Sequence, residues 1–338
     1  MRAGRNRPLI YTWARVPAEG AGMMGPLSHL RGTCMDAPAI SVIVAFRNMA
    51  REAPRTLHTL SPAYQQGVSA AEYEVIAVDA GSAVPLAEDV VCRHGPNFRL
   101  ISAVDDPSPA AAINAAANQS AGRAIAVCID GARMLSPGII RLTLQALRAW
   151  ANPVVATLAW HLGPTMQNIS MLEGYDQATE DRLLDSIDWR TDGYELFRIA
   201  CLAGSSAGGW FRPISESNFL TVRRTAWEQL GGLDARFRSL GGGFVNLDYY
   251  REACEQLGQL VILLGEGTFH QYHGGVATNV PLAEHPGLRF QDEYAAIRGR
   301  DFAAPTTPAA YLGSLPPQAL PFLVASAQQA LAAAGSGP

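Results

Sequence analysis

Short apolar runs with strand composition recur along the chain and are separated by segments of helix length. Residues 41–46 form the first run, and residues 73–78 form a second one about thirty residues later. Two nearly continuous apolar strands joined by a helix-length segment are typical of a parallel βαβ unit. The alternation continues as a helix at 84–94, a strand at 98–103, a helix at 108–121, and strands at 124–129 and 154–160. The pattern predicts an α/β fold with a parallel sheet and helices on both faces.

The pattern is less regular in the second half of the chain. Residues 177–187 have the composition of an amphipathic helix. The acidic residues in and just after this helix are expected to form a solvated face; they are Glu180, Asp181, Asp185 and Asp188. A segment rich in glycine and serine at 204–210 predicts a flexible loop,. Residues 224–230 predict a helix that ends at Gly231 and Gly232,.

The two ends of the chain differ in composition from the part between them. Residues 1–37 are rich in Gly, Pro and Arg, which predicts a poorly ordered extension,. Near the other end the sequence predicts helices at 291–298 and 319–334 and a Pro-rich linker at 305–317. We therefore expect a main domain at 38–280 and a helical C-terminal extension at 281–338. The last helix of this extension is a candidate for pairing two subunits in a homodimer or for contacting a membrane surface.

Composition excludes several classes of protein. The 338 residues carry a net charge of -4 and no long basic run, which argues against a nucleic acid partner,. The five cysteines are scattered and odd in number, which favours a reducing compartment over a disulfide framework,. No apolar run reaches the length of a transmembrane segment, and the N-terminal residues lack the pattern of a signal peptide,. The expectation is a cytoplasmic protein, with peripheral contact to a membrane left open.

Two aspartates follow strands at the positions where ligands are expected. Asp79 ends the second strand and Asp130 follows the strand at 124–129. In open parallel sheets ligands bind beyond the carboxyl ends of the strands. Asp79 can accept hydrogen bonds from a ribose or a base, or it can cap the turn that follows. Asp130 suits a divalent cation that bridges a diphosphate, or it can cap a helix that begins near residue 136.

Two histidines form a further candidate site. His270 and His273 stand three residues apart in a glycine-bounded loop that follows the apolar strand at 260–264. Imidazole nitrogens are common metal ligands and can also contact a diphosphate. The alternative is an aromatic pair that packs beneath the loop. The chain contains no Gly-x-Gly-x-x-Gly and no phosphate-loop lysine motif, which disfavours dinucleotide-binding and nucleoside-triphosphatase functions,.

Residues 41–48 and 74–82 together resemble the start of a family 2 glycosyltransferase. In that family the first strand opens the nucleotide pocket, and the aspartate after the second strand holds the nucleoside of a sugar-nucleotide donor. The segment here reads Val-Asp-Ala-Gly-Ser, so Ala80 departs from the usual form while Asp79 and Ser82 keep their places. The resemblance implies a GT-A-like fold with a mixed, mainly parallel sheet. It also implies transfer of a sugar from a nucleotide-diphosphate donor to a carbohydrate or other hydroxyl acceptor.

The segment that begins at Asp130 is similar to the family's Asp-x-Asp signature, whose loop ends in Pro-Gly as it does here. Ala132 occupies the second acidic position, so one ligand of the expected Mg²⁺ or Mn²⁺ is missing. Relatives of this fold often supply a histidine to the cation, and His270 or His273 would take that part. Asn114 matches the asparagine of the family's Arg-Asn-x-Gly helix. It is expected either to hold the loop near the diphosphate or to bond to nearby backbone.

The third similar segment extends from residue 215 to residue 254. It reproduces the strand that meets the donor sugar, an arginine pair, and a helix that ends in Gly-Gly. Glu216 and Asn218 flank this strand and are expected to reach sugar hydroxyls. Asn246 stands where inverting relatives have their catalytic base, and an amide cannot accept a proton. Asp248 is the nearest carboxylate in the sequence and is expected to carry any acid–base role.

Stereochemistry and catalysis both stay open at this point. The order Asn-Leu-Asp at 246–248 is also similar to the Glu-Asn-Leu-Glu/Asp form of polypeptide N-acetylgalactosaminyltransferases, which retain anomeric configuration. Ala132 and Asn246 suggest a second class, a non-catalytic nucleotide-sugar-binding protein on the same fold. A third class, the sugar nucleotidyltransferases, is disfavoured because the Gly-rich, Lys-containing loop expected near the first strand is absent.

Overall fold

A mixed β-sheet organises the part of the chain that the structure describes. The computed structural model describes residues 37–103 and 106–335. Ten strands form one sheet in these ranges, with eight in the order β10-β9-β6-β8-β4-β1-β2-β3, while β5 pairs with β9 and β7 pairs with β6. The strands are β1 (Ile40–Phe46), β2 (Tyr73–Asp79), β3 (Phe98–Ser102), β4 (Ala124–Cys128), β5 (Arg133–Leu135), β6 (Val154–Leu162), β7 (Ala200–Leu202), β8 (Leu220–Arg223), β9 (Leu260–His270) and β10 (Ala309–Gly313).

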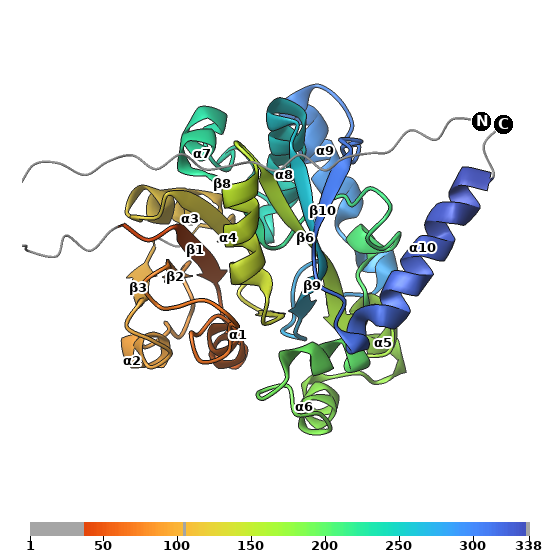
Figure 1. Ribbon diagram of the computed structural model, residues 1–338, viewed down its shortest axis with the longest axis horizontal. Helices are drawn as coiled ribbons and strands as arrows, with labels where there is room; N and C mark the ends of the chain where they lie inside the picture. Colours follow the sequence, from red (N-terminus) through yellow and green to blue (C-terminus); the bar gives the residue numbers. More distant parts are fainter. Residues whose placement is uncertain (1–36, 104–105, 336–338) are drawn as a thin grey trace, which may run out of the picture. The chain divides into compact units, whose positions relative to one another are not determined.

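Most of the strand pairs are parallel. β1 pairs in parallel with β2 and β4, β2 with β3, β6 with β9, and β9 with β10. β8 runs antiparallel between β4 and β6, and the short strands β5 and β7 are antiparallel to β9 and β6. Figure 1 shows β1, β2 and β3 at one side of the sheet and β6, β9 and β10 at the other. The predicted fold, α/β with a mixed and mainly parallel sheet, is confirmed.

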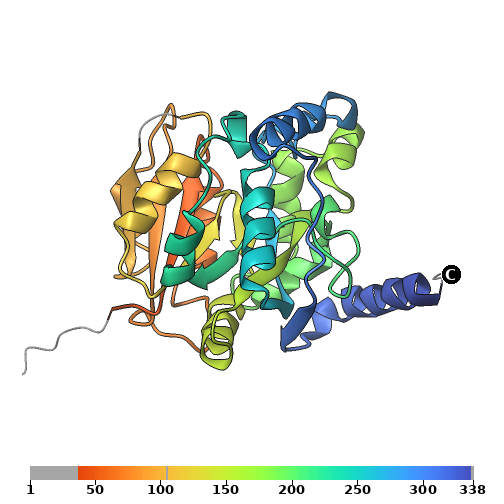
Figure 2. The same ribbon diagram turned by 90° about the horizontal axis from the view of Figure 1, so that it is seen from above.

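Helices cover both faces of the sheet (Figure 2). In β1, Ile43 and Ala45 belong to one core with helices on one face of the sheet, whereas Val42 and Val44 belong to another core with helices on the other face. Side chains alternate between the two faces of a strand, so a strand buried on both faces must be apolar throughout. The helices are α1 (Ala53–Thr59), α2 (Glu88–Cys92), α3 (Ala110–Asn118), α4 (Ile139–Ala149), α5 (Gln167–Ser170), α6 (Gln177–Asp185), α7 (Arg224–Leu230), α8 (Val245–Leu257), α9 (Gly287–Arg298) and α10 (Leu320–Gly335).

The described residues show no domain boundary at residue 280. Residues 305–317 were expected to be a linker, but they contain β10, which adds to the sheet beside β9. Tyr294 of α9 and Leu323 of α10 are buried in the main core. Residues 281–335 therefore complete the fold and do not form a separate extension. The expectation for residues 1–37 falls almost wholly outside the described residues, and pairing of two subunits through the last helices stays a prediction.

Two further local expectations are also corrected. Glu180 is fully buried, so the acidic residues of α6 do not form one solvated face. The predicted flexible loop at 204–210 begins with a short 3₁₀ turn (Gly204–Ser206) and ends at Trp210, which is buried against Trp160. Both errors have one cause, since polar and glycine-rich segments pack well when their polar groups find partners.

No helix within 37–103 or 106–335 has the length and apolar character needed to cross a bilayer.

One buried carboxylate joins β9 to the start of α4. Glu266 accepts hydrogen bonds from the Ser136 hydroxyl, the Gly138 N–H and the Tyr194 hydroxyl. Its side chain is fully buried, and burial raises its pKa to about 7 in spite of the three donors. The folded protein therefore holds this proton more tightly than the unfolded chain between about pH 4.5 and pH 7,.

This difference predicts how stability depends on pH. The contribution of Glu266 is fully present below about pH 4.5 and is lost as pH rises through about 7,. Its slope reaches at most about 1.4 kcal/mol per pH unit. Glu266→Gln removes the titrating group. The free energy of unfolding of this variant, measured with urea from pH 5 to pH 8, should therefore fall less steeply with rising pH than that of the wild type. Parallel curves for the two proteins would contradict the assignment.

Candidate functional site

A cavity opens beyond the carboxyl ends of three neighbouring parallel strands. It has a volume of about 300 Å³ and is lined by Phe46 at the end of β1, Ala80 after β2 and Asp130 after β4. Its wall also includes residues 47–49, 106–107, 109, 240–241 and 273–278. This is the edge at which open parallel sheets bind ligands. We refer to it as the strand-end cavity.

A second cavity adjoins the first. It measures about 510 Å³ and shares residues 129–130, 241 and 277–278 with the strand-end cavity. Five of its other polar lining residues come from β5, β6, α8 and the segment before β8; they are Arg133, His161, Glu216, Asn218 and Asn246. We refer to it as the inner cavity. Asp130 therefore stands where the two cavities meet.

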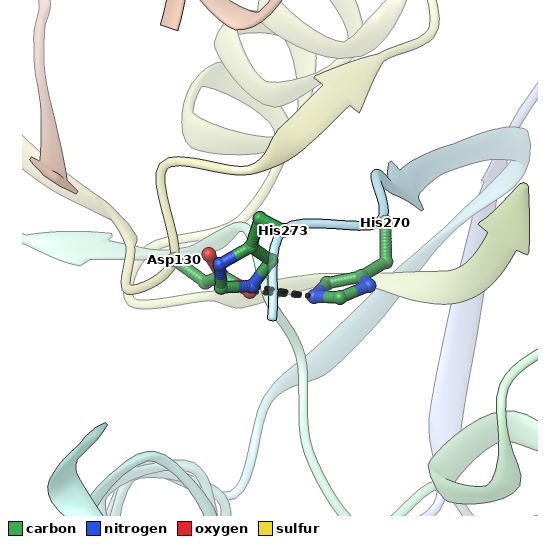
Figure 3. A group of neighbouring side chains, drawn as sticks. All are labelled: Asp130, His270 and His273. Atoms are coloured by element: carbon green, nitrogen blue, oxygen red, sulfur yellow. Dashed lines mark hydrogen bonds and ion pairs between the residues drawn. The ribbon is translucent and has the colours of Figure 1, made fainter. Parts of the chain in front are cut away.

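Asp130 is grouped with both of the histidines predicted from the sequence (Figure 3). Its Oδ2 atom lies 3.0 Å from His270 Nε2 and 3.8 Å from His273 Nε2. The two Nε2 atoms are 3.2 Å apart. Strand pairing explains this arrangement, because β5 follows Asp130 closely and runs antiparallel to β9 with Arg133 opposite His270. In residues 37–103 and 106–335 this is the one cluster of His, Cys, Asp and Glu side chains whose ligand atoms converge within 4.8 Å.

The tautomer of His270 is determined by its neighbours. Gln167 Nε2 donates to the carbonyl oxygens of Leu162 and His270, so its Oε1 atom must face His270 Nδ1, at 2.8 Å. Asn279 Nδ2 donates to the same Oε1 atom. His270 Nδ1 therefore carries a proton, and burial lowers the pKa of this histidine to about 4, so it is neutral near pH 7. The Nε2 atom that faces Asp130 then carries a lone pair, which can accept a hydrogen bond from His273 Nε2, 3.2 Å away, or bind a cation,.

The charge of Asp130 completes this picture. Burial opposes ionisation of Asp130, but His273, His270 and Arg133 together hold its pKa well below the usual range. A carboxylate oxygen and an imidazole lone pair thus face each other at 3.0 Å. The Thr278 hydroxyl lies 3.2 Å from the same nitrogen. Two such acceptors repel each other unless a cation lies between them, and an outer partner that orients a histidine is typical of metal sites. The donor set of two imidazoles and one carboxylate fits a divalent cation.

The loop that carries His273 is fixed by polar contacts. Asn279 Oδ1 accepts the backbone N–H groups of His273, Gly274 and Gly275, each within 3.1 Å. Glu180 of α6 accepts the N–H of Tyr272 at 2.6 Å, and it pairs with Arg51. Ala132 is fully buried, and its carbonyl oxygen accepts the N–H of Gln271 at 2.8 Å. These contacts hold the loop in place beside Asp130.

Asp79 does not line either cavity. Its two carboxylate oxygens accept the backbone N–H groups of Ser82 and Leu86, and the residue is buried. The Ser82 hydroxyl accepts the N–H of Asn48 instead of facing the cavity. Of the two roles that the sequence left open for Asp79, the structure shows the turn cap. Ala80, the residue at which the motif departs from the family, lines the strand-end cavity in its place.

Asn114 and Asp248 lie together at a third cavity, apart from the Asp130 cluster. The Asn114 side chain donates to the carbonyl oxygen of Leu233 and accepts the N–H of the same residue. It therefore has the structural role, holding the turn that follows α7. Asp248 forms two hydrogen bonds with the Arg298 guanidinium at 2.7 and 2.6 Å and is almost fully buried. Asp130 does not cap α4, whose N-cap is Gly138.

Glu216 is the second carboxylate of the inner cavity, besides Asp130. Asn246 Nδ2 donates to Glu216 Oε2 at 2.8 Å and to the carbonyl oxygen of Ser217 at 3.2 Å. Asn246 thus orients this carboxylate. Asn218 is nearly fully buried in the same wall. Of the residues around α8 that the sequence singled out, the structure brings Glu216, Asn218 and Asn246 together and leaves Asp248 outside.

Comparison with known proteins gives distant similarities only. The sequence matches no protein-family model and no curated protein. The structure is similar to the crystal structure of S. aureus TarS 1-349, with 12% identity and a TM-score of 0.43 over 70% of this chain and 58% of that chain. Crystals of TarS 1-349 with UDP and with UDP-GlcNAc give similar values. The chain spans between 40% and 64% of the length of the TarS chains.

A second similar structure is the mannosyltransferase PcManGT from Pyrobaculum calidifontis in complex with GDP-Man and Mn²⁺. Its identity is 17% and its TM-score is 0.39, over 89% of this chain and 76% of that chain. Among these structures, TarS is in complex with UDP or UDP-GlcNAc in two, and the mannosyltransferase is in complex with GDP-Man. TM-scores of 0.44 or less at these identities carry no argument about activity. Inferences about this chain therefore depend on its own residues.

Sequence reasoning missed several residues of the site. Arg133 and His161 line the inner cavity, and Gln167 and Asn279 orient the histidine loop. Arg133 follows Asp130 by three residues, so its closeness to Asp130 along the chain could have marked it as a residue of the site. Gln167 begins the short helix α5 and Asn279 belongs to an irregular segment, and nothing in their local sequence marks them.

The contacts of Asp79 predict a structural effect on mutation. Asp79→Ala leaves two backbone N–H groups without their acceptor, so it should lower the free energy of unfolding by about 1–3 kcal/mol. The affinity of the folded variant for uridine or guanosine diphosphate should be unchanged. Urea unfolding and calorimetry measure the two quantities, with the exposed Asp89→Ala as control. A variant that unfolds like the wild type but binds nucleotide more weakly would show that Asp79 contacts the nucleotide.

Proposed function

We propose that this chain is a glycosyltransferase that transfers a sugar from a nucleotide-diphosphate donor to a hydroxyl acceptor. The observation that carries the proposal is the junction of two cavities at the cluster of Asp130, His270 and His273. A sugar nucleotide has a nucleoside at one end, a sugar at the other and a doubly charged diphosphate between them. The nucleoside would occupy the strand-end cavity, the diphosphate the junction, and the sugar the inner cavity.

A divalent cation held by Asp130, His270 and His273 is part of this proposal. Its chemistry would be to neutralise the charge that develops on the leaving diphosphate. Two imidazole ligands favour Mn²⁺ over Mg²⁺, because Mg²⁺ prefers oxygen ligands. The two histidines would thus supply the ligand that Ala132 cannot. The N–H group of His270 Nδ1, held by Gln167, keeps the lone pair of Nε2 directed at the junction.

Glu216 is the group that we propose as acceptor-side base. In the transfer step, Glu216 takes the proton of the acceptor hydroxyl while the acceptor oxygen forms a bond to the anomeric carbon. The bond from that carbon to the diphosphate oxygen breaks, and the diphosphate leaves with the electron pair. Asn246 holds the Glu216 carboxylate at the cavity wall. Asp248, the base expected from the sequence, would have to act from the third cavity while paired with Arg298.

The cation site predicts a metal-dependent thermal shift. Uridine or guanosine diphosphate with Mn²⁺ should raise the melting temperature of the wild-type protein, and the same nucleotide with EDTA should raise it much less. Asp130→Asn and His273→Ala should each lose the metal-dependent part, because each removes one ligand atom. Asp89→Asn, a change in an exposed aspartate far along the chain from the cluster, serves as control. Equal shifts in Mn²⁺ and in EDTA for the wild type would reject the site.

The choice of base is tested by two matched variants. Glu216→Gln should slow turnover of the donor by about 10²–10⁴-fold, the range for loss of a general base. Asp248→Asn weakens a buried pair with Arg298, so it should lower the melting temperature and leave turnover of the folded enzyme close to normal. Turnover is followed as release of nucleoside diphosphate from a panel of UDP- and GDP-sugars. The reverse result would return the catalytic role to Asp248, and donor binding without any turnover would identify a binding protein.

A further inference from the structure

Arg133 is a buried cation whose hydrogen-bonding capacity is largely unused. It lines the inner cavity and is 5% exposed. Its Nε and Nη1 atoms are buried and have no hydrogen-bond partner among the described residues. A buried guanidinium without partners costs several kcal/mol. Such a group is retained where a ligand supplies the missing acceptors.

Asp130 forms an ion pair with Arg133 but does not supply these hydrogen-bond acceptors. Its Oδ2 atom is 3.7 Å from Arg133 Nε, beyond hydrogen-bond distance,. That same oxygen faces His270, and Oδ1 accepts the N–H of Ala132. Arg133 lines the inner cavity and is absent from the lining of the strand-end cavity. Its charge therefore lies on the sugar side of the junction, away from the proposed nucleoside position.

Asn218 and His161 are two further hydrogen-bond donors in the same cavity wall. Asn218 is 2% exposed, and its Nδ2 atom is buried without a partner among the described residues. His161 Nδ1 accepts the N–H of Gln167, so the neutral ring carries its proton on Nε2,. The cavity wall thus presents a guanidinium, an amide N–H₂ and an imidazole N–H. Donors of this kind match the oxygens of an anion, and arginine in particular binds planar carboxylates and phosphates through paired hydrogen bonds.

We propose that the inner cavity recognises an oxyanion, a carboxylate or a phosphate, carried by the transferred sugar or by the acceptor. This inference rests on the proposed function and names the class of substrate. Two carboxylates in this cavity repel an anion, Glu216 and Asp130, and the proposed cation would neutralise Asp130,. The oxyanion therefore binds at the Arg133 end and the reacting hydroxyl at the Glu216 end. Arg133 is then the residue that determines specificity for an acidic substrate.

The test compares charged and neutral ligands in two arms. The donor arm measures by calorimetry, with Mn²⁺ present, the affinities for UDP, UDP-glucose and UDP-glucuronate, and for GDP, GDP-mannose and GDP-mannuronate. The acceptor arm measures glucose, glucuronate and glucose 6-phosphate on the protein saturated with the nucleoside diphosphate that binds. In one of the two arms the wild type should bind the acidic ligand at least about tenfold tighter than its neutral counterpart, the range of one charge-assisted hydrogen bond or more. The arm that shows this preference identifies the source of the oxyanion.

Arg133→Gln should remove the preference and leave the affinity for the free nucleoside diphosphate unchanged. Arg133→Lys keeps the charge and should retain part of the preference. Arg212→Gln, which changes an exposed arginine outside both cavities, is the matched control. Melting temperatures identify any variant that has failed to fold, and Arg133→Lys keeps the test decisive if Arg133→Gln does fail.

Three results would overturn the proposal. One is a wild-type protein without preference for the acidic ligand in either arm. Another is an Arg133 variant whose affinities for the free nucleoside diphosphate, the neutral sugar ligand and the acidic sugar ligand all fall by the same factor. That result would show that Arg133 binds the diphosphate. The third is a wild-type protein that binds no nucleotide in any form. That result would overturn the proposed function as well, whereas the first two leave it standing.

Discussion

The pairing of β5 with β9 is the contact on which the site depends. A strand of three residues, Arg133–Leu135, runs antiparallel to the end of β9 and places Arg133 opposite His270. Without it, Asp130 and the histidines would sit at the ends of strands β4 and β9, which are separated in the sheet by β8 and β6. Because β5 follows β4 in the chain and pairs directly with β9, it connects these two parts of the sheet. It brings an anion, two imidazoles and a guanidinium into one region, so the site's charge pattern follows from backbone pairing.

Much of the fold follows from the sequence because burial on both faces requires apolar strands. The strands β1, β2, β3, β4 and β6 match the apolar runs within a few residues. The Pro-rich segment at 305–317 was misread because β10 lies at the edge of the sheet, where pairing to one neighbour needs little apolar sequence,. Glu180 was misread because its partners, Arg51 and Tyr272, are far from it along the chain.

The sequence predicts where the site lies better than it predicts which residues belong to it. Asp130 and the histidines stand at strand ends, where topology alone brings them to one edge of the sheet. Asp79 also stands at a strand end, yet its carboxylate turns toward the N–H groups of Ser82 and Leu86. Asp248 is two residues from Asn246 in α8, and positions two apart on a helix face different directions,. Neither side-chain direction can be read from a linear motif.

The burial of Ala132 limits how the cluster can be changed. At the second acidic position of the signature that this segment resembles, the chain has a fully buried methyl group, and the backbone carbonyl of the same residue accepts the N–H of Gln271. A carboxylate at this position would place a charge in a closed space, at a cost of several kcal/mol before any benefit to metal binding. A further ligand is therefore added to the cluster more readily on the loop that carries His273 than at residue 132, and engineering of the metal preference should begin on that loop.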